Sequence, residues 1–182
     1  METGNSREKF KEVKEFSFED GLKETARRIK ELLESQKYVA VAVGGLDIDD
    51  ANVGKSYFSG QLAQGLLLEK IPTIITNDTS GFIEQNLLPT LKTLQSIYEK
   101  EGGVVVFGAL GMPLQNLDKE QIANYHAMQD FALQKASRHN SEIKLSKMDV
   151  RVVLYRPEQQ PQKMNYDVGD IFIKNDKAKI KI

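Results

Sequence analysis

The pattern of apolar and polar positions divides the chain into alternating helices and strands. Apolar residues from Leu22 to Leu33 recur at helical spacing, which predicts an amphipathic helix over residues 18–36. Residues 38–43, with the sequence YVAVAV, form a continuous apolar run that ends at Gly44-Gly45. A short β-rich apolar run closed by glycine is typical of a buried strand.

The same alternation continues to the end of the chain. Further helices are predicted from about Gly54 to Glu69, over residues 87–98 and over residues 118–138, and further strands over residues 71–78, 103–107, 150–155 and 171–173. Pro89 predicts a kink or a restart in the helix that contains it. Strands that alternate with helices favour βαβ units, so we expect an α/β fold with about five mainly parallel strands and helices on both faces.

Composition limits the classes to which the chain can belong. Its 182 residues predict one domain, residues 17–182, preceded by a polar arm, residues 1–16. A net charge of −1 gives no overall attraction to nucleic acid or to an anionic membrane. The start of the chain is charged and lacks the apolar core of a signal peptide, and no apolar stretch is long enough to span a membrane. We therefore expect a cytoplasmic protein with no nucleic-acid or membrane partner, and a homo-oligomer stays open.

Two residue types restrict the chemistry further. Cysteine is absent, which excludes disulfides, thiolate metal sites and cysteine nucleophiles. The two histidines, His126 and His139, are separated by a spacing that matches no zinc motif. Catalysis or binding must therefore depend on other side chains and on the backbone.

The strongest chemical signal is Gly54-Lys55-Ser56, which follows a predicted strand and opens a predicted helix. A phosphate-binding loop requires this context, because the amide groups and the dipole of a helix amino end favour an anion. Lys55 would reach the outer phosphates and the Ser56 hydroxyl would ligate Mg²⁺. The full motif G-x-x-x-x-G-K-[ST] has glycine where this chain has Asp49, and Gly45 lies four residues too early.

On these residues the chain resembles P-loop kinases of the uridine kinase-like group, members of the P-loop NTPase superfamily. The resemblance covers about residues 38–176 and rests on YVAVAVGG, NVGKSYFSGQLAQGL, IPTIITNDTSGF and, more loosely, DVRVVLYRP and GDIFIKND. It implies a three-layer sandwich that binds ATP and Mg²⁺ and transfers the γ-phosphoryl group to a hydroxyl of a small molecule, for example a nucleoside.

The resemblance also implies roles for individual residues. Lys55 and Asp78 would be catalytic, with Asp78 as the base that accepts the acceptor's proton. Ser56 and Asp49 would face the metal, and Arg138 would belong to a basic lid over the phosphates. The expected nucleotide-binding residues are Gly45, Asn52, Val53, Gly54, Lys55, Ser56, Tyr57 and Arg138.

Alternatives remain at this point. The third strand and its loop, VVVFGALG, lack the acid that such kinases carry there, which favours a non-catalytic or regulatory nucleotide-binding protein on the same fold. NVGKS also resembles the first motif of translation-type GTPases, but their N-K-x-D motif is absent, as is the dinucleotide motif G-x-G-x-x-G. The tripeptide can also be incidental in a structural protein, and Asp78 can be a turn residue.

Overall fold

The computed structural model describes residues 14–46, 53–76, 86–108, 119–138, 142–159 and 170–176. They form an α/β structure built on one sheet of six strands in the order β1-β6-β5-β2-β4-β3, and every neighbouring pair is parallel. The strands are β1 (Glu15–Phe16), β2 (Tyr38–Gly45), β3 (Thr73–Thr76), β4 (Gly103–Phe107), β5 (Val150–Tyr155) and β6 (Ile171–Lys174). The helices are α1 (Phe18–Leu33), α2 (Lys55–Leu68), α3 (Leu88–Tyr98) and α4 (Lys119–Ser137).

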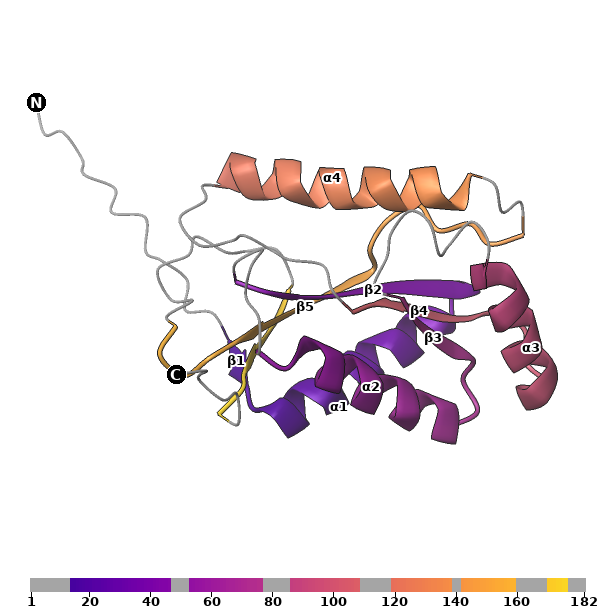
Figure 1. Ribbon diagram of the computed structural model, residues 1–182, viewed down its shortest axis with the longest axis horizontal. Helices are drawn as coiled ribbons and strands as arrows, with labels where there is room; N and C mark the ends of the chain where they lie inside the picture. The colour runs from indigo at the N-terminus through magenta and orange to yellow at the C-terminus, as the bar shows by residue number, and fades with distance from the viewer. Residues whose placement is uncertain are drawn as a thin grey trace, which may run out of the picture.

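The helices cover both faces of the sheet, so the expected three-layer arrangement is confirmed. α1 and α2 lie on one face and α4 lies on the other (Figure 1). Ile29 of α1 and Phe58 of α2 belong to one apolar core. Leu91 of α3 and Leu133 of α4 belong to the second core, on the opposite face.

The direction of each connection explains which face its helix covers. The connections through α1 and α2 cross the sheet in one direction, whereas those through α3 and α4 cross it in the other. Right-handed crossovers between parallel strands place helices with opposite crossing directions on opposite faces. The distribution of the four helices therefore follows from the order of the strands.

β2 shows why the strands are apolar throughout. Ala40 and Ala42 face the core under α3 and α4, while Val41 and Val43 face the core under α1 and α2. All four side chains are fully buried. A strand covered on both faces has no side exposed to water, so its sequence is continuously apolar instead of alternating.

The observed elements differ from the expected ones in several of their bounds; for example, β2 runs on to Gly45 and β3 begins at Thr73, not at residue 71. The sheet has a sixth strand, because Glu15 and Phe16, at the end of the expected polar arm, pair with β6. α1 ends at Leu33, short of residue 36. Pro89 agrees with one of its two expected outcomes: α3 restarts at Leu88, directly after the π-helical residues Asn86 and Leu87, and Pro89 lies in its first turn, where no amide hydrogen is needed.

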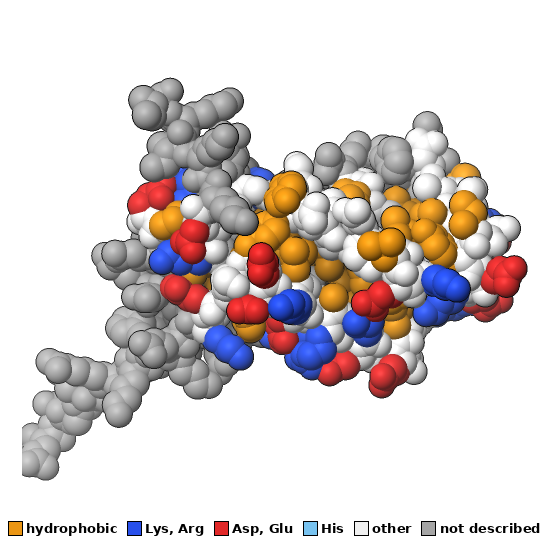
Figure 2. Space-filling model, turned by 90° about the horizontal axis from the view of Figure 1, so that it is seen from below, with side chains coloured by type: hydrophobic (Ala, Val, Ile, Leu, Met, Phe, Trp, Pro, Cys, Tyr) orange, Lys and Arg blue, Asp and Glu red, His pale blue; other side chains and the backbone are white. Residues whose placement is uncertain are grey.

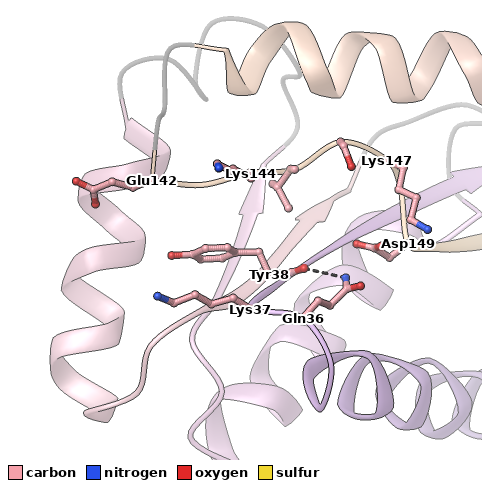
Figure 3. Close-up of a pocket in the computed structure, with 9 residues that line it drawn as sticks. Gln36, Lys37, Tyr38, Glu142, Lys144, Lys147 and Asp149 are labelled. Carbon is pink, nitrogen blue, oxygen red and sulfur yellow. Dashed lines mark hydrogen bonds between the residues drawn. The ribbon is translucent and has the colours of Figure 1, made fainter.

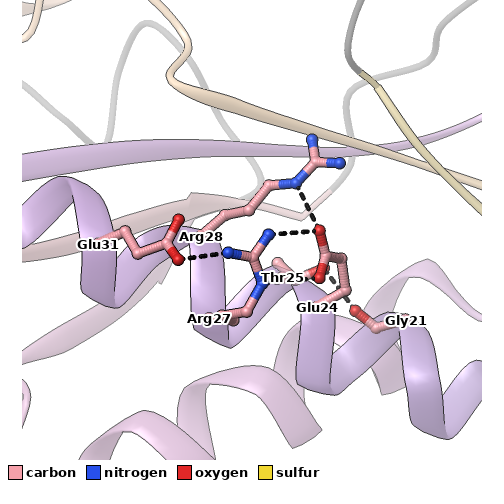
Figure 4. A network of polar contacts seen from close by, with 6 residues as sticks. All are labelled: Gly21, Glu24, Thr25, Arg27, Arg28 and Glu31. Carbon is pink, nitrogen blue, oxygen red and sulfur yellow. Dashed lines mark hydrogen bonds and ion pairs between the residues drawn. The ribbon is translucent and has the colours of Figure 1, made fainter.

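Ion pairs hold the polar face of α1 (Figure 4). The Arg27 guanidinium lies 2.8 Å from the Glu24 carboxylate and also contacts Glu31, and Arg28 lies 2.9 Å from Glu24. The hydrogen bond from Arg27 is the main cause that lowers the pKa of Glu24 to about 2. A lowered carboxyl pKa stabilises the fold above the unfolded value, so this contribution is lost as the pH falls from about 4.5 towards 2.

None of the helices in the described ranges is long and apolar enough to cross a membrane.

Candidate functional site

The carboxyl ends of the parallel strands meet at one edge of the sheet, which we call the carboxyl edge. β2 and β5 are neighbours there, with Gly45 paired to Leu154. The connection from β2 leads towards β3, whereas β5 is followed by β6 on the other side. Ligands of open α/β sheets bind outside the strand ends at such a switch point. Leu46, which follows β2, and Val53 and Gly54, which precede α2, belong to this end of the sheet.

The segment before α2 is fixed by a side chain from the far end of the sequence. The amide nitrogen Nδ2 of Asn175 donates to the carbonyl of Val53 over 3.0 Å, across 122 residues of sequence. The backbone N–H of Asn175 donates to the carbonyl of Tyr155 over 2.9 Å. Asn175 is 5% exposed and Val53 is fully buried. Asn175 therefore joins the ends of β5 and β6 to the start of α2.

Gly54 is required at this position for two reasons. Its φ of +92° lies in the left-handed region, which a side chain rarely adopts. A Cβ at Gly54 would also lie 2.5 Å from Nδ2 of Asn175. The left-handed turn reverses the chain so that α2 begins immediately, and the N–H of Phe58 donates to the Gly54 carbonyl over 2.8 Å.

The amino end of α2 has no side-chain cap, because its capping residue is Gly54. The first turn carries Lys55, Ser56 and Tyr57, and amides in this turn point out of the helix without an intrahelical acceptor. Lys55 is half-buried and Ser56 is exposed. The free amide hydrogens and the helix dipole therefore favour an anion at this helix end, and the first turn also contains a lysine and a serine.

Aromatic packing sets the position of this helix end. Phe58 is fully buried and packs edge-on against Phe18 of α1, with ring centroids 5.5 Å apart. Tyr57 stacks on the same Phe18 ring, with centroids 5.6 Å apart. Because two successive residues of α2 are held by one ring of α1, the amides of the first turn have a defined direction.

The structure brings Gly45, Val53, Gly54, Lys55, Ser56 and Tyr57 to the carboxyl edge, as the sequence pattern predicts. Asp49, Asn52 and Asp78 lie outside the described residues. β3 ends at Thr76, whose carbonyl accepts from Gly108 over 2.9 Å at this same edge. Asp78 follows two residues later in the sequence and stays a prediction.

The structure does not bring Arg138 to the amino end of α2, where the sequence places it over the phosphates. α4 runs from the carboxyl edge back to the opposite edge, because it connects the end of β4 to the start of β5. Its last two turns contact the segment before β5, where Gln134 donates to the Ser146 carbonyl over 2.7 Å and Ser137 donates to the Leu145 carbonyl over 2.8 Å. Arg138 follows α4 at this amino edge, whereas Gly54 lies at the carboxyl edge. The two residues are therefore about the length of a strand apart.

A pocket of about 340 Å³ lies at the amino edge (Figure 3). Gln36 and Tyr38 line it from the start of β2, and Asp149 lines it from the start of β5. Gln36 donates to the Tyr38 carbonyl over 2.9 Å, and Asp149 accepts from the N–H of Ala40 over 2.9 Å. These contacts hold the amino ends of the two strands.

A polar cluster lies between α4 and the sheet, and the pattern of the sequence did not predict it. Arg151 of β5 reaches Asp130 over 3.0 Å and Gln129 over 3.3 Å. His126 lies 3.5 Å from Asp170, which precedes β6. Arg151 is a charged residue inside an apolar strand, and this was the one feature of the sequence that indicated a polar contact there. The cluster ties α4 to β5 and β6.

The hydroxyl oxygen of Ser56, in the first turn of α2, offers a single ligand for a metal. Groups of three or more His, Asp or Glu side chains that could hold a metal do not occur within the described ranges. Mg²⁺ is commonly held by one or two protein ligands together with substrate phosphates and water. Ser56 fits such a shared site, in which phosphate oxygens supply most of the ligands.

Comparison with known proteins returned no match: no family model, no curated protein and no solved structure resembles this chain at a significant level. The function must therefore be inferred from the site itself.

The contact between Asn175 and Gly54 makes a stability prediction. Asn175→Ala should lower the free energy of unfolding by about 1–3 kcal/mol, because it leaves the buried Val53 carbonyl without its donor. Gly54→Ala should also destabilise, by positive φ and by the clash with Asn175. In the double variant the clash is gone, so its loss of stability should be smaller than the sum of the losses in the two single variants.

Urea unfolding of the four proteins measures this coupling. Losses that add within about 0.3–0.5 kcal/mol would mean that the two residues do not interact. Asp176→Ala, next to Asn175 and exposed, is the control for a change at the end of β6.

Proposed function

We propose that this protein is an ATP-dependent phosphotransferase that binds ATP·Mg²⁺ at the amino end of α2 and phosphorylates a hydroxyl of a small molecule. One observation carries the proposal: a left-handed glycine and an uncapped helix amino end, with Lys55 and Ser56 in its first turn, follow an interior parallel strand. Each part of that arrangement favours phosphate. The combination is the one expected of uridine kinase-like P-loop kinases.

The order of the strands supports this proposal over dinucleotide binding. β4 lies between β2 and β3, so the two strands that α2 connects are not neighbours in the sheet. In the dinucleotide-binding order 3-2-1-4-5-6, the first and second strands are adjacent. The order therefore agrees with the absence of the dinucleotide motif from the sequence.

The proposed roles follow from where the groups lie. The amides of the first turn of α2 bind phosphate oxygens, and the Lys55 ammonium neutralises their charge. The Ser56 hydroxyl contributes a ligand to Mg²⁺, which neutralises phosphate charge when bound. Asp78, two residues beyond β3 in the sequence, orients the acceptor hydroxyl and accepts its proton as the phosphoryl group is transferred.

A second candidate function is nucleotide binding without transfer. β4 ends at Phe107, which is 1% exposed, and Gly108 follows it, so these two residues present no carboxylate to hold a metal or its water. A protein that keeps the α2 site but lacks this acid would bind ATP and serve as a regulatory or binding protein.

Lys55→Ala should weaken ATP·Mg²⁺ binding about tenfold to a hundredfold, since a hydrogen bond to a charged group contributes about 1.5–3 kcal/mol. Titration calorimetry measures this, with urea unfolding to show that the variant is folded. Lys70→Ala is the matched control, because it removes an exposed lysine just beyond the other end of the same helix. Equal affinity in wild type and Lys55→Ala would remove the phosphate site from α2.

Asp78→Asn should lower the rate of phosphoryl transfer about 10²–10⁴-fold, the usual contribution of a general base, and leave ATP affinity unchanged. Transfer from labelled ATP to a panel of nucleosides and other alcohols is the assay. Asp176→Asn makes the same charge change after β6, at the same edge, and should keep full activity. Full activity in Asp78→Asn would exclude the base, and ATP binding without transfer in wild type would support the second candidate.

A further inference from the structure

The outward face of α2 carries no charge along its length. From Ser56 to Leu68 the helix contains no Lys, Arg, Asp or Glu. Tyr57 and Leu68 are nevertheless 64% and 78% exposed. Figure 2 views the molecule from the side of α1 and α2, and its charged side chains gather in one band while apolar side chains form a neighbouring band. The ion pairs of α1 account for charge on this side of the molecule.

The exposed and half-exposed positions of this face are symmetric along the helix. They are Tyr57, Gly60, Gln61, Gln64, Gly65 and Leu68, which we call the α2 face. Positions equidistant from the midpoint between Leu62 and Ala63 carry matching chemistry. Glycine corresponds to glycine, glutamine to glutamine, and at the ends an aromatic residue corresponds to a leucine.

We propose that the α2 face binds a second copy of this chain, with the two α2 helices antiparallel about a two-fold axis through that midpoint. Such an axis places Gly60 opposite Gly65 of the second copy, Gln61 opposite Gln64, and Tyr57 opposite Leu68. A symmetric dimer requires one patch that is complementary to itself. The two glutamine amides, each with donor and acceptor, satisfy this requirement.

The glycines have no role that the single chain explains. A Cβ at Gly60 or at Gly65 would meet no atom within 4 Å, and both have ordinary helical φ. Glycine inside a helix is destabilising relative to alanine. Between two antiparallel helices, the absence of side chains at the glycines lets the two backbones approach closely. This close approach would explain why glycine occupies these positions.

The absence of charge selects a second copy over a different partner. In a two-fold contact a charged residue near the axis lies close to the same residue of the second copy, and like charges across an interface are unfavourable. An uncharged face avoids that cost. Ile75 of the edge strand β3 is 37% exposed and faces the same side of the sheet as α2, so it extends the apolar surface.

The size of the surface predicts the strength of the dimer. α2 has 14 residues and is therefore about 21 Å long and about 10 Å wide. Stable complexes bury about 800 Å² on each partner, which exceeds what one helix face and one neighbouring side chain supply. We therefore expect a reversible monomer–dimer equilibrium that depends on concentration. This inference does not depend on the phosphate site.

Sedimentation equilibrium over a series of protein concentrations tests the dimer. Wild type should show a monomer–dimer equilibrium. Gln61→Lys with Gln64→Lys places like charges opposite one another and should weaken dimerisation at least about tenfold. Asn124→Lys, an exposed position of α4 on the other face, is the control and should leave it unchanged.

The orientation has its own test. Gln61→Lys with Gln64→Glu places lysine opposite glutamate in the antiparallel arrangement, so this variant should dimerise again at low salt. In a parallel arrangement it would place like charges opposite one another. Failure of this rescue, a monomeric wild type, or a dimer that is lost with Phe131→Lys on α4 but not with the double-lysine variant would each overturn the proposal.

Gly65→Ala separates the dimer from stability. Alanine should raise the melting temperature of the monomer by about 2–4 °C, because the helix is better formed and the new Cβ meets empty space. The same methyl group should weaken the dimer, since it lies where the backbones meet. A variant that is more stable and dimerises as well as wild type would contradict the close approach.

Discussion

The hydrogen bond from the Asn175 side chain to the Val53 carbonyl joins the end of β6 to the start of α2 at the candidate site. It holds the residues that precede α2, because Val53 accepts the bond and a Cβ at the left-handed Gly54 would lie 2.5 Å from the same Asn175 amide. β5 depends on the same residue through its contact with Tyr155. This side chain and the aromatic contact with Phe18 therefore help to set the direction of the first-turn amides of α2, on which any binding of phosphate there depends.

Most of the fold could be predicted because its signals are local. Continuous apolar runs identify buried strands, and helical spacing identifies the helices between them. β1 could not be predicted, since a strand of two residues has no period, and Phe16 pairs only because β6 is adjacent. The order of the strands was also out of reach, because it depends on packing between segments that are distant in sequence.

The residues of the candidate site that are contiguous in sequence could be predicted, whereas those distant in sequence could not. Gly54, Lys55 and Ser56 are contiguous, so their role at a strand-to-helix turn is visible in the sequence. Asn175 was missed because one asparagine after a short strand carries no motif. The position of Arg138 depends on the direction of α4, which must return to the amino edge before β5 can begin parallel to β2. The residues around Arg138 do not show that direction.

The most direct measurement is a backbone ¹H–¹⁵N titration of the protein with ATP·Mg²⁺ and with inorganic pyrophosphate. The account predicts that the largest shifts with both ligands occur at the amides of Lys55, Ser56 and Tyr57, because those groups would donate to phosphate oxygens. Gly54→Ala should abolish these shifts. Shifts centred instead on Gln36, Tyr38 and Asp149 at the amino-edge pocket, or no shifts in the first turn of α2, would contradict the account.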